Sequence, residues 1–501
     1  MKASIQKFGL PRAAAASCIW LLAGCAVGPD FVPPAAPRQA GYTEQPLAAQ
    51  TAAAPVAGGE AQRFMLGQDI PQQWWTLFHS AALNALIEDA LKHNPNLQAA
   101  QAALRVAQEN VLAQQGAYYP SVNANFTSAR QKEATASVAS SAASGASLFN
   151  LHTAQVTVSY TADVFGGNGR QVESLQAESD SQRFQWEAAK LSLTANVVAA
   201  AVQEASLRAQ IAALGTIVLS LQQQLSLLRH QLFAGAIAEA NVVGQQATLA
   251  QTKALLPPLK KQLAQQRDLL AALAGRFPSD AGAEKFDLSM LNLPQELPLT
   301  LPSNLVAQRP DVRAAEEQLH AASAQIGVAK ANMLPQFTLS GGGGGMATEI
   351  GQIFNSGNGF WNLAAGLTQP VFAGGMLLHR KRAAEAAYDE AAAQYRSTVI
   401  SAFQNVADTL EALQYDADAV QEAVAAERAI ALSLAIAKRQ VELGDSSNLA
   451  LLTAEQAYQQ SLIILVQAQA SRYADTAALF QALGGGWWNR GVAGADENRS
   501  H

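Results

Sequence analysis

The chain is poor in the residues on which most enzymes and metal sites depend. It has two cysteines among 501 residues, and 14% of its residues are charged against 49% that are hydrophobic. No Gly-x-Ser-x-Gly or His-Glu-x-x-His motif occurs, and the seven histidines show no metal-ligand spacing, standing at positions 79, 93, 152, 230, 320, 379 and 501. We therefore expect no catalytic site, metal or cofactor, and predict that the protein is not an enzyme.

An excess of basic residues is also missing. The chain has 33 Lys and Arg against 39 Asp and Glu, a net charge of −6, so nucleic acid is not an expected partner. An adjacent carboxylate pair, Glu316-Glu317, falls on a predicted helix, where neighbouring side chains point in different directions. We expect this pair to face solvent and to form no acid–base site.

The N-terminus has the pattern of an export signal. Basic residues precede an apolar stretch, 13–23, that is too short to cross a bilayer as a helix. The sequence Leu22-Ala23-Gly24-Cys25 looks like a bacterial lipoprotein box, which predicts a signal peptide at 1–24 and an acylated Cys25; a chance cysteine near the cleavage site is the alternative. Ala26 after it resembles the outer-membrane address of such lipoproteins. Because Cys18 leaves with the signal, no thiol remains for a disulfide.

The most informative feature is an internal duplication. Residues 25–63, rich in Pro, Ala and Gly, are interpreted as a tether, and two repeats are expected after it, at 64–275 and 308–486, joined by a linker at 276–307 and followed by a flexible tail at 487–501. Five motifs recur in the same order: Asn94-Pro95-Asn96 as Arg309-Pro310-Asp311, Tyr119-Pro120 as Leu334-Pro335, Val164-Phe165-Gly166-Gly167 as Val371-Phe372-Ala373-Gly374, Gly235 as Gly444, and Leu273-Ala274-Gly275 as Leu483-Gly484-Gly485.

Each repeat has the same predicted elements. A helix of about 25 residues ends before a proline, two alternating segments follow as a β-hairpin, and two long helical segments complete the repeat. The hairpins are predicted at 121–163 and 336–369, and the helices at 170–273 and 376–482. Apolar residues at heptad spacing predict helices packed as coiled coils: Leu214, Val218, Leu221, Leu225, Leu228 and Leu232 in the first repeat, and Leu410, Leu413, Ala417, Val420 and Val424 in the second. The short helix of each repeat is expected to stack end to end on the returning helix.

The glycine loop Val164-Phe165-Gly166-Gly167-Asn168-Gly169 could suggest a phosphate cradle, because it lies between a strand and a helix. It fits neither the dinucleotide fingerprint nor the Walker loop, and Arg170 after it is interpreted as a charge at a helix start. The repeat indicates instead that the glycines form a junction between a strand and a long helix. The junction residues are predicted to be Pro120, Gly166, Gly167, Pro335, Gly374 and Gly375.

The four predicted strands have the length of tilted membrane-spanning β-strands. Four strands cannot close, and an open sheet edge in lipid leaves backbone groups unsatisfied. Strands from other copies must complete the sheet, and three copies would give twelve strands, wide enough for a lumen. The predicted fold class is an α+β membrane protein: a duplicated repeat with long coiled-coil helices and four transmembrane strands per chain, forming a trimeric twelve-stranded barrel.

The ends of the mature chain carry the motifs of a known family. They are Cys25-Ala26-Val27-Gly28-Pro29-Asp30-Phe31, Trp74-Trp75 with Phe78, Asn94-Pro95-Asn96-Leu97 and Leu483-Gly484-Gly485-Gly486-Trp487. Through them the chain resembles the TolC-like outer membrane factors of the NodT type, which are efflux lipoproteins. The resemblance implies a trimer anchored in outer-membrane lipid, with a helical barrel in the periplasm and an equatorial belt at 64–92, 276–307 and the tail. It also implies a passive exit duct for drugs or other small molecules, joined by a periplasmic adaptor to an inner-membrane pump of the resistance-nodulation-division type.

The resemblance places adaptor contacts and a gate at the two helix turns. The tip residues are Gly235, Glu239, Asn241, Glu442, Gly444 and Asp445. At the gate the chain departs from the family, because Val441, Ser446, Ala450 and Thr453 stand where better-known members carry Tyr, Arg and two Asp residues. We therefore expect weaker electrostatic closure and weaker block by cations. How this gate closes is not evident from the sequence.

Two alternatives remain open at this level. An exit duct of type I protein secretion would have nearly the same sequence features. A coiled-coil structural lipoprotein without a pore would explain the heptads and Cys25, but not the paired alternating segments. The transported substrate and the identities of the pump and adaptor cannot be inferred from this chain alone.

Overall fold

A computed structural model describes residues 26–39, 41–132, 148–280, 282 and 284–489. The chain forms two compact units, each built from three segments of sequence. The first comprises 1–34, 104–181 and 315–395, and the second comprises 35–103, 182–314 and 396–501. Four helices continue from one unit into the other: α3 (Pro95–Gln115), α4 (Gly167–Phe233), α8 (Pro310–Ala331) and α9 (Met376–Leu443). Cys25 lies outside the described residues.

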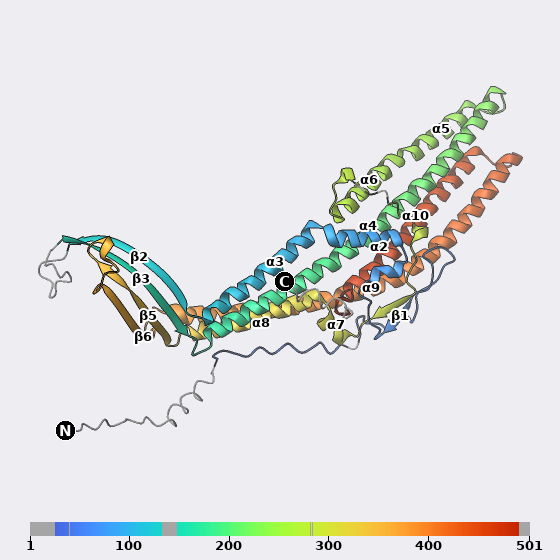
Figure 1. The fold of residues 1–501 in the computed structure, drawn as a ribbon. Coiled ribbons are helices and arrows are strands. Elements are labelled where there is room, and N and C mark those ends of the chain that lie inside the picture. The colour runs from blue at the N-terminus through green and yellow to red at the C-terminus, as the bar shows by residue number, and fades with distance from the viewer. Residues whose placement is uncertain (1–25, 40, 133–147, 281, 283, 490–501) are drawn as a thin grey trace, which may run out of the picture. The chain divides into compact units, whose positions relative to one another are not determined.

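The first unit contains a four-stranded antiparallel sheet in the order β2-β3-β5-β6 (Figure 1). The strands are β2 (Ser121–Lys132), β3 (Leu148–Ala162), β5 (Gln336–Ala347) and β6 (Gly359–Thr368). Short 3₁₀ turns stand at Gly116–Tyr118 and Ile350–Gln352. The two hairpins join through β3 and β5, which pair from His152 opposite Ala347 to Ala162 opposite Phe337. Four strands and long helices confirm the predicted fold class of the single chain.

The second unit is helical, with one short parallel strand pair, β1 (Arg63–Leu66) beside β4 (Glu296–Leu299). Its helices are α2 (Ala81–His93), α5 (Glu239–Ala254), α6 (Leu256–Leu273), α7 (Pro302–Gln308) and α10 (Asn448–Ala482), with 3₁₀ turns at Trp74–Phe78, Pro278–Asp280, Leu288–Met290 and Trp487–Asn489. The break between α5 and α6 falls next to Pro257-Pro258, because proline lacks the amide that a continuous helix needs.

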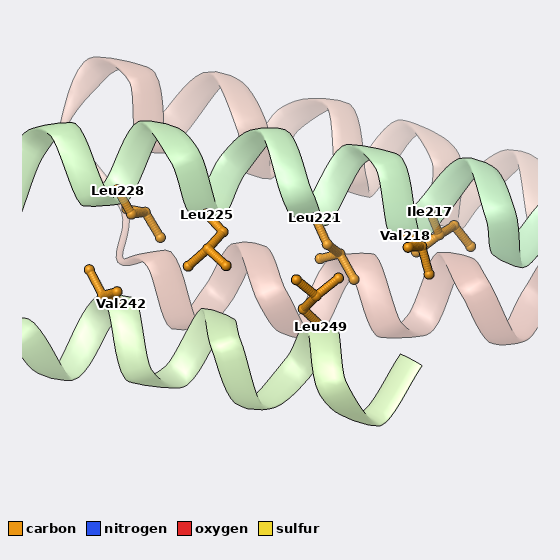
Figure 2. Close-up of a cluster of buried hydrophobic side chains, with 7 residues drawn as sticks. All are labelled: Ile217, Val218, Leu221, Leu225, Leu228, Val242 and Leu249. Carbon is orange, nitrogen blue, oxygen red and sulfur yellow. The ribbon is translucent and has the colours of Figure 1, made fainter. Parts of the chain in front are cut away.

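The heptad seams form the contacts between the long helices, as predicted. Leu221, Leu225 and Leu228 of α4 point toward Val242 and Leu249 of α5 in one buried cluster (Figure 2). In the second repeat, the corresponding stripe of α9 is buried throughout: Leu410, Leu413, Ala417, Val420 and Val424. Burying each such side chain contributes about 1.5–3 kcal/mol, which offsets the conformational entropy lost by ordering helices of this length.

The short helix of each repeat begins where the returning helix ends, which confirms the predicted stacking. Asn94 caps α3 by accepting from the amides of Asn96 and Leu97, and its Nδ2 donates to the carbonyl of Leu273 at the end of α6. In the second repeat the Arg309 guanidinium donates to Asp311 and to the Ala482 carbonyl at the end of α10. An amide in the first copy and a guanidinium in the second therefore each satisfy one of the last carbonyls of the returning helix.

One sequence prediction fails here. Glu316 was expected to face solvent, but it is only 7% exposed. The helix α8 buries a broad face, which includes Val312, Ala314, Ala315 and Leu319, so a position beside its apolar stripe is covered as well. Glu317 lies within 3.4 Å of the His320 ring.

The segment expected to be a tether is held by hydrogen bonds in the second unit. The buried Arg472 side chain donates to the carbonyls of Gly58 and Glu60 and to the Thr51 hydroxyl. Gln62, also buried, donates to the Pro294 carbonyl and to Thr476. A single cation on α10 thus fixes residues 51–62, because its N–H donors find backbone and side-chain acceptors there.

Candidate functional site

The sheet has one apolar and one polar face. Residues directly opposite in the register lie on the same face, so alternate residues of all four strands form two continuous surfaces. The apolar face carries Val122, Phe126, Val156, Val158, Tyr160, Phe337, Leu339, Trp361, Leu363 and Leu367. Toward the far ends of β2 and β3 the same face becomes polar, with Ser128, Arg130, Lys132, Asn150 and His152. The polar face carries Asn123, Asn125, Thr127, Gln131, Thr153, Gln155, Thr157, Ser159, Thr161, Gln336, Thr338, Ser340 and Asn362. Most of these apolar side chains are exposed, as on a strand that meets lipid on one side and water on the other.

The two outer strands of the sheet, β2 and β6, have no strand partner within the described chain on their free edges. An unpaired edge presents a row of N–H and C=O groups that another strand can complete. In hydrocarbon each such group costs several kcal/mol if left unpaired. The sheet of a single chain is therefore incomplete as a membrane-spanning structure.

The first strand–helix junction is closed by a carboxylate that the sequence analysis missed. Asp163, just after β3, accepts from the amide of Asn168 through Oδ1 (3.0 Å) and from that of Gly169 through Oδ2 (2.8 Å). Gly166 takes a positive φ of 72° to bring the chain round. The α4 N-terminus, where a phosphate would bind, thus already holds an anion. An acidic residue shortly before a predicted helix was the available signal.

Arg170 is a structural residue of the same junction. It is 7% exposed, and its guanidinium lies 2.7 Å from Asp30 and 2.7 Å from Glu173. Both carboxylates raise the pKa of this guanidinium against the opposing effect of burial. The Phe31 ring stacks on the His320 ring at 4.4 Å. Residues 30 and 31 are therefore fixed to the first unit by charge and by an aromatic contact, and Arg170 is more than a charge at a helix start.

The second junction is open. Gly374 and Gly375 have positive φ values of 58° and 84°, and a Cβ added at Gly374 would meet nothing within 4 Å. Val371 and Phe372 beside them are 93% and 89% exposed. Gly167 begins α4, Pro120 directly precedes β2, and Pro335 directly precedes β5, so all six predicted junction residues stand at strand–helix connections.

The two helix turns have the same backbone geometry. Gly235 and Gly444 have positive φ values, 70° and 79°. The amide after each glycine donates to a carbonyl five residues earlier, from Ala236 to Gln231 and from Asp445 to Gln440, as in a Schellman turn. Glycine is required here because other residues adopt this φ only with strain.

The side chains at these turns are mixed in character. Glu239, Glu442 and Asp445 are exposed, and Glu442 pairs with Arg439 at 3.0 Å. Phe233, at the end of α4, is 95% exposed. Asn241, Val441 and Ser446 are partly buried, while Ala450 and Thr453 are exposed on α10. The structure therefore leaves most of the predicted tip residues accessible, and adds an exposed aromatic ring that the sequence analysis did not single out.

A polar layer crosses the helices behind the turns. Gln224 of α4 donates to Glu455 of α10 and accepts from Gln245 of α5 (3.0 Å). Burial raises the pKa of the Glu455 carboxyl, and its second oxygen has no hydrogen-bond partner. This layer interrupts an otherwise apolar packing of α4 on α5, and it links the helices of the first repeat to α10 of the second.

A pair of carboxylates lies between α9 and α10. Asp416 is hydrogen-bonded to Asp475. Burial, this hydrogen bond and the negative charge of Asp475 together raise the pKa of Asp416 to about 7. Within the described part of the chain, no group of three or more His, Cys, Asp or Glu side chains could hold a metal ion.

Comparison with known proteins agrees with this geometry. The profile of the outer membrane efflux protein family matches residues 86–276 and 301–485. Two relatives are the pyoverdine export outer membrane protein OpmQ of Pseudomonas putida, 29% identical over 87% of this chain and 92% of that protein, and outer membrane protein OprJ of Pseudomonas aeruginosa, 29% identical over 96% and 95%. The solved outer-membrane channel OprN has a TM-score of 0.81 at 26% identity, covering 92% of this chain and 100% of that chain.

The two-faced sheet and the long paired helices define a channel of the outer-membrane efflux type. The family match covers more than half of the sequence, and the chain belongs to the outer membrane efflux protein family. It is an outer-membrane efflux protein with periplasmic helices. The family is one of transport ducts, and this agrees with a function other than catalysis.

Proposed function

We propose that three copies of this chain close into one twelve-stranded barrel and serve as the exit duct of a tripartite efflux pump. The observation that carries this proposal is the sheet: four strands, two free edges, one apolar face and one polar face. Three copies give twelve strands, which enclose a lumen, whereas two copies give eight, which side chains would fill. The polar face then lines the pore.

The exposed apolar side chains of the helices support the same assembly. Leu219 and Leu227 of α4 and Leu432 and Ile436 of α9 are all exposed in the single chain. α4 is long and apolar enough to cross a membrane by length and composition alone. Only 28% of its most apolar window is buried within the single chain, so much of this apolar surface has no partner there. We assign these side chains to contacts between copies in a periplasmic helical barrel, because helices that leave an apolar stripe exposed need a partner in water.

The polar face favours transport of small molecules without selection by charge. On the described strands it presents mostly amides, hydroxyls and glycines, together with a few apolar side chains such as Leu151, Met346 and Phe360, and no Asp, Glu, Lys or Arg. Rings of charge are what make pores ion-selective. The relative OpmQ is named for pyoverdine export; for this chain, we propose that pump and adaptor choose the cargo.

The two turns form the proposed site of contact with a periplasmic adaptor, which would couple the duct to an inner-membrane pump of the resistance-nodulation-division type. The accessible Glu239, Glu442 and Asp445 and the exposed Phe233 support this assignment. We further propose that Cys25 is acylated and anchors the chain in lipid.

Planar-bilayer recording of the purified protein tests the proposed duct. Stable single-channel conductance with mass consistent with a trimer is the expected result, whereas a protein that stays monomeric and gives no conductance would exclude it. The same recording tests the gate. Because Val441, Ser446, Ala450 and Thr453 carry no charge, trivalent cations added at the periplasmic side should block weakly, and nanomolar block would contradict the proposed uncharged gate.

A further inference from the structure

We propose that the apolar face of the sheet contains a trough for a saturated acyl chain, and that its occupant is the acyl group carried by Cys25. The proposal rests on the acylation of Cys25 proposed above. It concerns a site within the first unit, formed by β3, β5 and β6.

The trough exists because part of one strand has only glycines on this face. Gly341 and Gly343 of β5 stand opposite Val158 and Val156 of β3, and opposite Leu363 and Trp361 of β6. Large side chains on both neighbours thus flank a bare strip of backbone. The resulting cavity has a volume of about 930 Å³, and apolar groups dominate its walls. A run of five glycines would be a poor choice for a strand on propensity alone.

The trough is closed at the end that carries the β5–β6 loop. Ile353 of this loop is 3% exposed, and its backbone lies where a Cβ on Gly345 would stand. Beyond Leu339, at the opposite end, the apolar face continues to Phe337, whose ring lies 6.5 Å from that of Phe165. A chain-like apolar ligand would therefore enter from the Phe165 end.

The N-terminal segment reaches the first unit at this same end. The amide of Val27 donates to the Phe165 carbonyl at 3.1 Å. The Ala26 Cβ lies 2.8 Å from where a Cβ on Gly166 would stand. Cys25 directly precedes Ala26 in the sequence, so one peptide bond joins it to this segment. An acyl group on Cys25 therefore begins beside the Phe165–Phe337 contact.

The length of the face suits such a chain. From Phe337 to Gly343 the strand rises by six residues, roughly 20 Å. Half of a hydrocarbon core about 30 Å thick is of similar size. A tethered acyl chain also has a high effective concentration at a site within its reach, which favours it over a free lipid of the same chemistry. We therefore assign the acyl group of the chain itself as the occupant of the trough.

Photo-crosslinking tests the proposal on the full-length protein in cells. A benzophenone amino acid at Leu339 should crosslink to the acylated N-terminal peptide, identified by mass spectrometry after digestion. The same probe at Thr338, one residue away on the polar face, should not. Filling the trough with Gly343→Leu should abolish the crosslink, because a Cβ at Gly343 meets its neighbours only at 3.6 Å and beyond and the side chain takes the free space. Ala124→Leu places the same side chain on the same face outside the trough, and should leave the crosslink intact.

The outcomes separate this proposal from the one on which it rests. Metabolic labelling with an alkyne fatty acid shows whether Cys25 is acylated. A protein that incorporates no label, and whose labelling is therefore unchanged by Cys25→Ser, would overturn both the acylation of Cys25 and the trough assignment. A labelled protein whose Leu339 probe captures phospholipid, or captures nothing, would overturn the trough assignment and leave acylation standing.

Discussion

The two strand–helix junctions have closely related sequences but different surroundings. At the first, Asp163 caps α4, and the segment from Ala26 to Phe31 lies against Gly166 and Arg170. At the second, Pro370 stands in place of Asp163, and Val371 and Phe372 are exposed. One copy of the duplicated motif, the first junction, is thus covered by the N-terminal segment of its own chain. The other copy is exposed in the single chain, and in the proposed trimer it faces lipid or another subunit.

The largest expected effect comes from filling the first junction. Gly166→Val should cost more than Gly374→Val, although both place a β-branched residue at positive φ, a strain of about 1–3 kcal/mol. At Gly166 the new side chain must also displace the Ala26 backbone, 2.9 Å away, whereas Gly374 has open space. Thermal unfolding and the amount of folded protein in the outer membrane would measure the difference. Equal losses would show that the segment around Ala26 moves away from Gly166 at little cost in free energy.

Phe372→Asp tests what covers the second junction. Burying a carboxylate between copies or in lipid costs several kcal/mol, so we expect this variant to lose trimers on native gels. Phe233→Asp is the matched control, because that ring is equally exposed but lies at a helix turn. The control should keep its trimers and lose crosslinking to the adaptor. Loss of trimers in both variants would mean that exposure alone decides the result.

Arg170→Met tests whether the Arg170 ion pairs hold the N-terminal segment against the first junction. The change removes both ion pairs, with Asp30 and Glu173, and we expect a loss of about 1–3 kcal/mol together with faster proteolysis near residue 30. Leu377 occupies the corresponding place in the second copy, so Leu377→Ala should leave that cleavage rate unchanged. Unchanged proteolysis in Arg170→Met would show that the Phe31–His320 stack and the Val27–Phe165 hydrogen bond hold the segment without the ion pairs.

The smallest effect concerns a difference inside the helices. Counted back from the turn glycines, Asp416 stands in the second copy where Leu207 stands in the first. Because the pKa of Asp416 is raised to about 7, the folded protein binds this proton more tightly than the unfolded chain does. The associated stability is present at low pH and is lost as pH rises through about 7.

Asp416→Asn should therefore raise the unfolding temperature at pH 8 by a few degrees, on the order of 2–4 °C, and change it little at pH 5. Asp418→Asn removes the same charge from the same helix and serves as the control. An equal gain at both pH values would show that the effect is not linked to this proton.

Much of the architecture followed from local patterns. Prolines and glycines marked the ends of the helices, and the alternating segments became β2, β3, β5 and β6 close to the predicted bounds. The heptad stripe from Leu214 to Leu228 is buried as expected. The six junction residues and the two turns also stand where the repeat placed them. These features can be predicted from the sequence because each depends on residues within a few turns or strands of one another.

The failures share a different cause. Arg170 and Arg472 contact residues that lie 140 and 412 positions away in the chain, and their local sequence does not indicate these partners. Glu316 is buried because of what α8 packs against, and its own neighbours in sequence gave no sign of this.

By itself, the sequence determined the duplication, the helix and strand periods and the glycine turns, because each of these depends on residues that lie close together in the chain. Only the tertiary structure decided that β3 pairs with β5, that one junction is covered while the other is open, and that a bare strip lies between Val156 and Trp361. Those properties arise where distant segments meet, and the free energy of such contacts depends on both partners at once.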